Sequence, residues 1–197
     1  AIRYTLDGSW PGPESPVYEN SIPVSANTVI RARVFEDGKM PGPVFTQSYI
    51  FNENTAMPVI SISSDPDNFY SGDRGIHVEG WRGRTGYCIL DRKVNWNRDW
   101  ERPVNFEYYL PSGDQALNQL AGIKITGGCS RANPLKSLAI FGRKIYGDNS
   151  LSYPFFKSKD VKEFKDIVLR NSGNDVVGCM FRDGFMQTLL VGRMDID

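Results

Sequence analysis

Two stretches near the N-terminus alternate between apolar and other side chains, and each is directly followed by an Asp-Gly pair. They cover residues 2–6 and 28–36. A period of two residues places alternate side chains on opposite faces of a β-strand, so Ile30 and Val34 share one face and Arg31 lies on the other. Asp-Gly is a strong signal for the tight turn between antiparallel strands. We therefore expect residues 1–52 to form a small β-sandwich of the immunoglobulin or fibronectin type that lacks its first strands.

The pattern changes after a polar segment at residues 52–56, which we interpret as a linker between two units. The second unit, residues 57–197, contains short strands and a helix near 177–192. A brief helical turn is expected from the Asp65-Pro66 pair, and residues 71–102 predict a long loop. The whole chain is thus predicted to be mainly β with an α+β second unit. Its strands are expected near 58–64, 103–109, 119–127, 135–142 and 166–170.

Composition excludes several classes of function. Acidic and basic residues number 23 each, so the chain has no global field that would gather nucleic acid. No apolar run reaches the length of a membrane span, and the sequence opens without a signal segment. Three cysteines, Cys88, Cys129 and Cys179, are too few for a zinc ribbon, and their disulfide state stays open. The single histidine, His77, excludes a histidine-rich metal centre, so no metal ligand is assigned.

The first unit resembles the small β-sandwich at the C-terminus of chitobiases and β-hexosaminidases. The resemblance rests on the segment from Ile2 to Ser9, on Pro16-Val17-Tyr18, and on residues 30–33 with the turn that follows them. It implies an exported protein and marks the fold more strongly than the function, because such modules are appended to many secreted proteins.

The second unit resembles the N-terminal part of the spore-coat CotH kinase family. The matching motifs follow one another in order and are residues 100–104, 122–125, 127–131, 134–137, 169–175 and 182–183. The resemblance implies an atypical protein kinase that transfers phosphate from ATP to a protein serine, with magnesium as the metal. The aspartates that hold the metal in this family are expected downstream of residue 197, and Asp195 and Asp197 do not occupy their place. We therefore expect a fragment that is inactive by itself.

The stretch from Gly122 to Phe141 is the first candidate for a phosphate site. It is not a Walker loop, because Gly128 and Cys129 stand where Lys and Ser or Thr are required. Gly127 and Gly128 could still let backbone N–H groups approach a phosphate, with Lys136 on the next strand reaching the same anion. The alternative is that Lys136 is a surface or salt-bridge lysine.

Three arginines complete this candidate site, namely Arg131, Arg170 and Arg182. A guanidinium at these positions could clamp a phosphate or pair with a structural carboxylate, and the sequence leaves both open. Nearby, Asp175 is expected to cap the following helix. The predicted nucleotide site therefore consists of Gly127, Gly128, Arg131, Lys136, Arg170 and Arg182, and no residue is assigned a catalytic role.

A second functional hypothesis rests on the tryptophans of the long loop. Trp96 and Trp100 could stack on sugar rings, although such residues more often anchor a loop to the core. His77 is interpreted as an ordinary strand residue rather than a catalytic base. The alternative to a kinase fragment is therefore a non-catalytic, carbohydrate-associated binding module of an extracellular glycan-processing protein. Under either hypothesis the protein is exported, and its partner is a protein serine substrate or an extracellular glycan.

Overall fold

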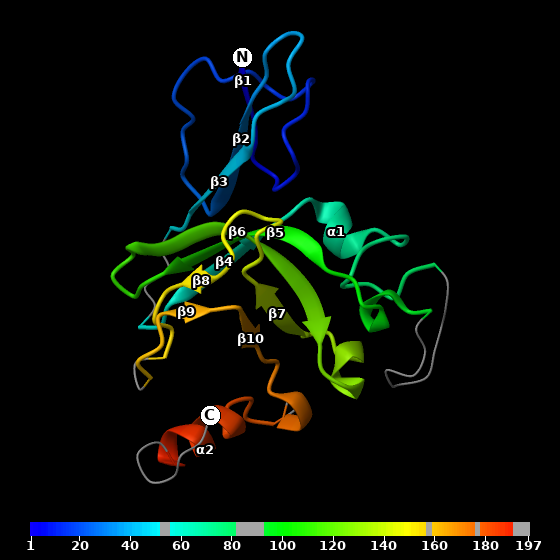
Figure 1. Cartoon of the computed structure of the whole chain (residues 1–197), viewed down its shortest axis with the longest axis vertical. Helices are drawn as coiled ribbons and strands as arrows, with labels where there is room; N and C mark the ends of the chain where they lie inside the picture. The colour runs from blue at the N-terminus through cyan, green and yellow to red at the C-terminus, as the bar shows by residue number, and fades with distance from the viewer. Residues whose placement is uncertain (52–55, 82–92, 157–158, 176–177, 191–197) are drawn as a thin grey trace.

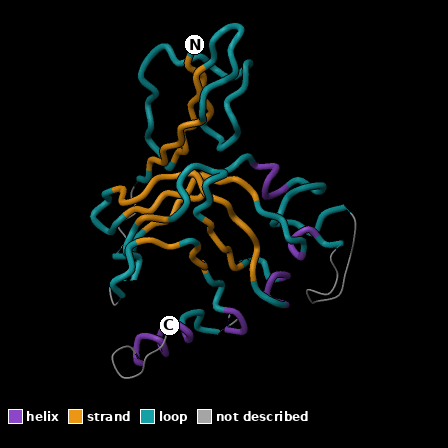
Figure 2. Tube along the Cα trace, in the orientation of Figure 1, coloured by secondary structure: helices purple, strands orange, loops and turns teal. Residues whose placement is uncertain are grey.

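The computed structural model describes residues 1–51, 56–81, 93–156, 159–175 and 178–190. Within them the chain is mainly β, as predicted, with three antiparallel sheets and short helices (Figures 1 and 2). The predicted linker lies almost wholly outside the described residues, as do parts of the long loop and of the C-terminal segment.

The first unit is one three-stranded sheet in the order β1-β2-β3. Both predicted Asp-Gly turns are present, because Gly8 and Gly38 have φ angles of +80° and +74°, which glycine adopts without strain. The register pairs Tyr4 with Ala32. The strands are β1 (Ile2–Thr5), β2 (Thr28–Val34) and β3 (Val44–Tyr49).

This sheet buries its polar face and exposes its apolar one. Arg31 and Thr46, which are cross-strand partners, are 1% and 6% exposed. On the opposite face Val34 and Phe45 are 48% and 67% exposed. At Thr46 and Ser48 this face contacts the second unit, which lies below the first unit in Figure 1, whereas Arg31 is covered by Gly8 and the Trp10 ring of its own unit.

The second unit is built on a five-stranded antiparallel sheet in the order β10-β7-β6-β5-β4. The predicted strands are all found, with shifts of a few residues at their ends. Their bounds are β4 (Val59–Ser63), β5 (Arg102–Tyr109), β6 (Gln115–Thr126), β7 (Ser137–Phe141) and β10 (Asp166–Leu169).

One face of this sheet carries the hydrophobic core. Phe106, Ile123 and Ile140 are fully buried at its centre. Phe155 covers them, with its ring 6.4 Å from that of Phe106 in an edge-on arrangement. Near Phe155 the chain forms a further sheet of two strands, β8 (Leu151–Ser152) and β9 (Glu163–Phe164). The sequence pattern did not predict this sheet.

The remaining elements are short. Helix α1 (Pro66–Tyr70) begins as predicted, because the Asp65 side chain accepts a hydrogen bond from the Asp67 N–H. Helix α2 begins at Arg182 rather than near 177, and residues 176–177 and 191–192 of the predicted helix lie outside the described residues. Three 3-10 turns complete the fold, at η1 (Asn95–Asn97), η2 (Cys129–Ala132) and η3 (Gly173–Asp175).

Two local predictions are wrong. Lys136 does not lie on the strand that follows the glycine turn, because β7 starts only at Ser137 and Lys136 precedes it. His77 lies in a bend after α1 rather than in a strand, and its N–H donates to the Phe69 carbonyl. In both places the alternation of residue types extends past the point where the backbone pairs with a neighbouring strand.

Candidate functional site

The predicted glycine turn joins β6 to β7 through η2. Gly127 has a φ of +107°, and a Cβ at this position would come 2.8 Å from the Ser130 Oγ, so the turn requires glycine there. Gly128 is the residue directly before η2. Arg131 folds back over the turn, and its Nε donates to the Gly127 carbonyl at 2.6 Å.

Lys136 closes the same turn from below and is 6% exposed. Its Nζ donates to the carbonyls of Arg131 at 2.5 Å and Asn133 at 2.9 Å. The ammonium also lies 4.2 Å from the centre of the Trp96 ring, a cation–π distance. Lys136 is therefore neither a surface lysine nor, among the described residues, a salt-bridge lysine.

Burial lowers the pKa of Lys136 to about 8. The cause is desolvation, which disfavours the charged form when no anion is nearby. Burial also lowers the pKa of Arg131, which remains charged at neutral pH because arginine starts so high. The turn thus places two partly desolvated cations beside a glycine backbone.

Asn171 ties the end of β10 to this turn. Its Nδ2 donates to the Leu135 carbonyl at 2.7 Å, and its Oδ1 accepts from the Ser137 hydroxyl at 2.9 Å. The side chain is 2% exposed. No pattern in the sequence distinguishes Asn171 from its polar neighbours. Its buried position follows from the strand pairing of β7 with β10.

The other two predicted arginines follow β10 and begin α2. Arg170, next to Asn171, is exposed. Arg182 pairs with Asp175 at 3.0 Å, and its backbone N–H donates to the same carboxylate. Asp175 therefore accepts from the first N–H of α2, although it lies in η3, seven residues before Arg182, and not at the predicted position directly before the helix. A hydrogen bond from the Cys179 thiol, together with that N–H and the Arg182 charge, lowers the pKa of Asp175.

Cationic side chains lie over the rings of Trp96 and Trp100 in the long loop. Trp96 packs against the core and carries the Lys136 ammonium. Trp100 also packs against the core, with the guanidinium carbons of Arg98 and Arg102 each 4.7 Å from its ring centre. A sugar that stacked on either ring would have to displace these contacts.

A polar network joins the two units and was not anticipated from the sequence. Glu107 on β5 is 0% exposed, and its carboxylate accepts from the Ser48 N–H at 2.9 Å and the Ser48 hydroxyl at 2.6 Å. The Tyr109 hydroxyl donates to it at 2.8 Å, and the Gln115 amide at 3.0 Å. Burial and the neighbouring carboxylate raise the pKa of Tyr109, so the phenol keeps its proton. The first unit is thus docked through Ser48 and is not a freely hinged appendage.

The described part of the chain contains neither a candidate metal-binding cluster nor a candidate membrane-spanning helix. There, no three side chains of the His, Cys, Asp and Glu types come together in an arrangement that could hold a metal ion. None of the described helices has the length and apolar character needed to cross a bilayer. Cys129 is disulfide-bonded, whereas Cys179 is an exposed free thiol.

Comparison with known proteins bears on the first unit. Residues 1–46 match the family model of the chitobiase/beta-hexosaminidase C-terminal domain. This confirms the resemblance seen in the strand and turn motifs of that unit. No curated protein and no solved structure matches the chain. The resemblance of the second unit to the CotH family stays a prediction.

Proposed function

We propose that this chain is a non-catalytic, carbohydrate-associated binding module of an extracellular glycan-processing protein. The observation that carries the proposal is the match of residues 1–46 to a domain family named for chitobiases and β-hexosaminidases, enzymes that process glycans. The disulfide at Cys129 supports export, because disulfides persist mainly in oxidising compartments.

The state of the buried acidic residues supports a binding role over a hydrolytic one. Glu107 and Asp175 are both buried and already accept several hydrogen bonds. Glu101, half-buried, accepts from Tyr146 and pairs with Arg143. Glycoside hydrolysis needs two carboxyl groups that face a substrate, one of them free to give a proton. These three carboxylates are instead committed to holding the fold.

The test is binding to glycans. The purified chain is screened on an array of bacterial and chitin-type oligosaccharides, and positive ligands are confirmed by calorimetric titration. We expect binding without release of reducing sugar. Silence across the array, or turnover of any bound glycan, would overturn the proposal.

The buried charge of Lys136 favours a second candidate, a CotH-like kinase activity in the intact protein. Within the described residues no carboxylate lies within ion-pair distance of its ammonium. A phosphate group of ATP would supply the missing anion, with Arg131 beside it and Gly127 and Gly128 offering backbone. Arg170 would join it from the end of β10, which pairs with β7, whereas Arg182 would first have to leave Asp175. Magnesium and the serine substrate would be held by parts of the protein beyond those described.

Calorimetric titration with magnesium and ATP tests this second candidate. Binding should be weakened at least tenfold by Lys136→Ala and left unchanged by Lys144→Ala, a control at an exposed lysine. Equal affinity in the wild type and the Lys136 variant would exclude Lys136 as a phosphate ligand. Absence of ATP binding by any form of the protein would exclude the kinase hypothesis and leave the first proposal intact.

A further inference from the structure

A cleft of about 440 Å³ opens where the two units meet. The Asp7-Gly8 turn and Thr28 line it from the first unit, and Ser63 with α1 lines it from the second. Binding clefts for small molecules have volumes of roughly 300–1,000 Å³ and often lie between domains. The size of this cleft suits a single sugar residue or a disaccharide.

Three buried polar atoms at this junction have no hydrogen-bond partner. They are the Arg31 Nε, the Thr46 Oγ1 and the Ser63 Oγ, on side chains that are 1%, 6% and 5% exposed. Arg31 and Thr46 lie at paired positions of β2 and β3, and Ser63 lines the cleft itself. Buried donors and acceptors are nearly always satisfied, because leaving one unpaired costs about 1–3 kcal/mol. Arg31 and Thr46 do not line the cleft, so the Ser63 hydroxyl is the unpaired group among these three that a polar ligand in the cleft would meet.

The rim of the cleft adds an ionised acceptor. The Asp7 Oδ1 accepts from the Ser9 hydroxyl and N–H, and these bonds lower the pKa of the carboxyl group. Arg31 is anchored beside it by a 2.8 Å hydrogen bond to the Gly8 carbonyl. The acid on the rim disfavours an anion, while the unpaired Ser63 hydroxyl disfavours a purely apolar ligand. A ligand that both donates and accepts hydrogen bonds can pair with the Asp7 carboxylate and with the Ser63 hydroxyl.

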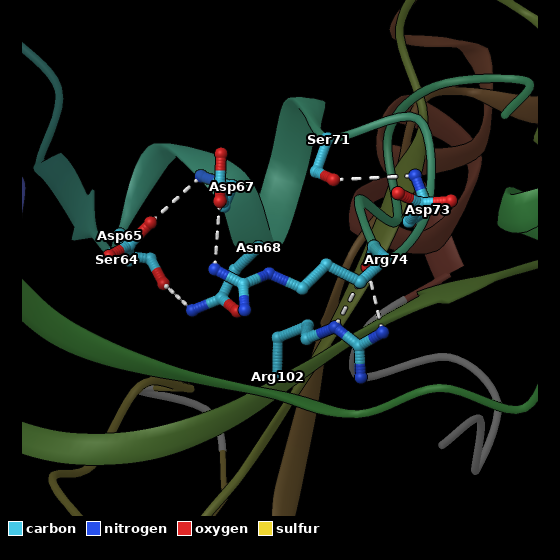
Figure 3. Close-up of polar contacts among 8 residues, drawn as sticks. All are labelled: Ser64, Asp65, Asp67, Asn68, Ser71, Asp73, Arg74 and Arg102. Carbon is cyan, nitrogen blue, oxygen red and sulfur yellow. Dashed lines mark hydrogen bonds and ion pairs between the residues drawn. The ribbon is translucent and has the colours of Figure 1, made fainter.

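Two aromatic rings from α1 supply an apolar surface. Phe69 and Tyr70 line the cleft, and Tyr70 is 66% exposed. The helix is held in place by a chain of polar contacts (Figure 3): Asn68 donates to the Ser64 hydroxyl, and Arg74 pairs with Asp67. Arg102 in turn donates twice to the Arg74 carbonyl. The rings are therefore presented from a fixed support rather than from a loose loop.

We propose that this junction cleft binds a neutral sugar residue, with Asp7 accepting from its hydroxyls, Ser63 hydrogen-bonding to it and Tyr70 stacking on its apolar face. The inference rests on the proposed carbohydrate-associated function and assigns the site for it. It differs from the tryptophan hypothesis, because Trp96 and Trp100 are already covered by cations. The proposed site also depends on the docking of the two units, since neither unit alone contains all of its residues.

The experiment compares three probes and four proteins by calorimetric titration. The probes are N-acetylglucosamine, its β-1,4-linked disaccharide and inorganic phosphate. The proteins are the wild type, Tyr70→Ala, Ser63→Ala and Phe45→Ala, the last removing an equally exposed ring from the far face of the first sheet. We expect each of the two cleft substitutions to weaken sugar binding about tenfold and Phe45→Ala to leave it unchanged.

Thermal unfolding separates binding from structure. Ser63→Ala removes a hydroxyl without a partner, so it should weaken the sugar while leaving the melting temperature unchanged or higher. If neither cleft substitution changes the sugar affinity, the cleft is not the sugar site, and the proposed function remains. Binding of phosphate in place of sugar would likewise exclude the cleft as the sugar site. If glycans of every kind fail to bind the wild type, both proposals fall together.

Discussion

The two larger sheets of this protein bury opposite kinds of side chain. The five-stranded sheet encloses Phe106, Ile123 and Ile140 on its core face. The three-stranded sheet buries Arg31, Thr46 and Ser48 and leaves Phe45 in solvent. The first arrangement is stabilised by transfer of apolar area from water, and the second by hydrogen bonds that are worth something only while both units stay together. The difference teaches that the first unit is held by its neighbour more than by its own core.

Substitutions at two adjacent residues of β5 test this difference between the sheets most directly. Phe106 points into the core, and Glu107 points toward the first unit. Phe106→Ala should lower the free energy of unfolding by about 3–5 kcal/mol, because it leaves a cavity in packed surroundings. Urea denaturation followed by tryptophan fluorescence measures the loss. A loss below about 1 kcal/mol would mean that this core is loosely packed.

Glu107→Gln should cost less, about 1–3 kcal/mol, because the amide keeps the shape but replaces one acceptor oxygen with a donor. Its signature should differ from that of Phe106→Ala. We expect amide hydrogen exchange to rise across residues 44–49 while the β5–β6 hairpin stays protected. Uniform loss of protection in both units would contradict a docked first unit.

The lowered pKa of Lys136 predicts that the free energy of unfolding depends on pH. Its pKa is about 8 in the folded protein and near its ordinary value of 10.5 in the unfolded chain. Between these values the unfolded state binds more protons, so stability rises with pH, by at most about 3 kcal/mol. Below pH 8 both states are protonated and the slope vanishes. Chemical denaturation at pH 7, 8, 9 and 10 measures the rise, which Lys136→Met should remove, so parallel curves for the two proteins would contradict it.

The smallest effect is expected on the exposed apolar face. Phe45→Ser should change stability by no more than about 0.5 kcal/mol, because the ring is already 67% exposed. Denaturation in urea under the same conditions provides the measurement. A larger loss would show that this face is covered in solution.

Local patterns predicted the strands well and the site only in part. Alternation placed β5, β6 and β10 within a few residues, and the Asp-Gly pairs located both turns of the first unit. The contact of Asp175 with the first N–H of α2 was predicted, but its position was not, because the helix begins only at Arg182. The position of Lys136 was not, because its acceptors are backbone carbonyls and its ring partner Trp96 is 40 residues away in the sequence.

The junction was beyond the reach of sequence patterns for the same reason. Glu107 reads as an ordinary polar residue of an alternating strand, and only the docking of Ser48 makes it a buried acceptor. Asp7 and Ser63 likewise belong to different units, so no spacing rule brings them together. For the nucleotide hypothesis, the structure places Gly127, Gly128, Arg131 and Lys136 in one turn, whereas Arg182 is committed to Asp175.

The bond between Ser48 and Glu107 also bears on the order in which the chain folds. The two residues are 59 positions apart, whereas β5 and β6 are joined by a tight turn in which the Leu110 N–H donates to the Asp114 carbonyl. Closing a short loop costs less entropy than closing a long one, so the hairpin forms early and the first unit docks late. Until that step Glu107 remains a hydrated charge at the centre of the nascent sheet. Folding kinetics should therefore show a docking phase that Glu107 substitutions alter and that leaves hairpin formation untouched.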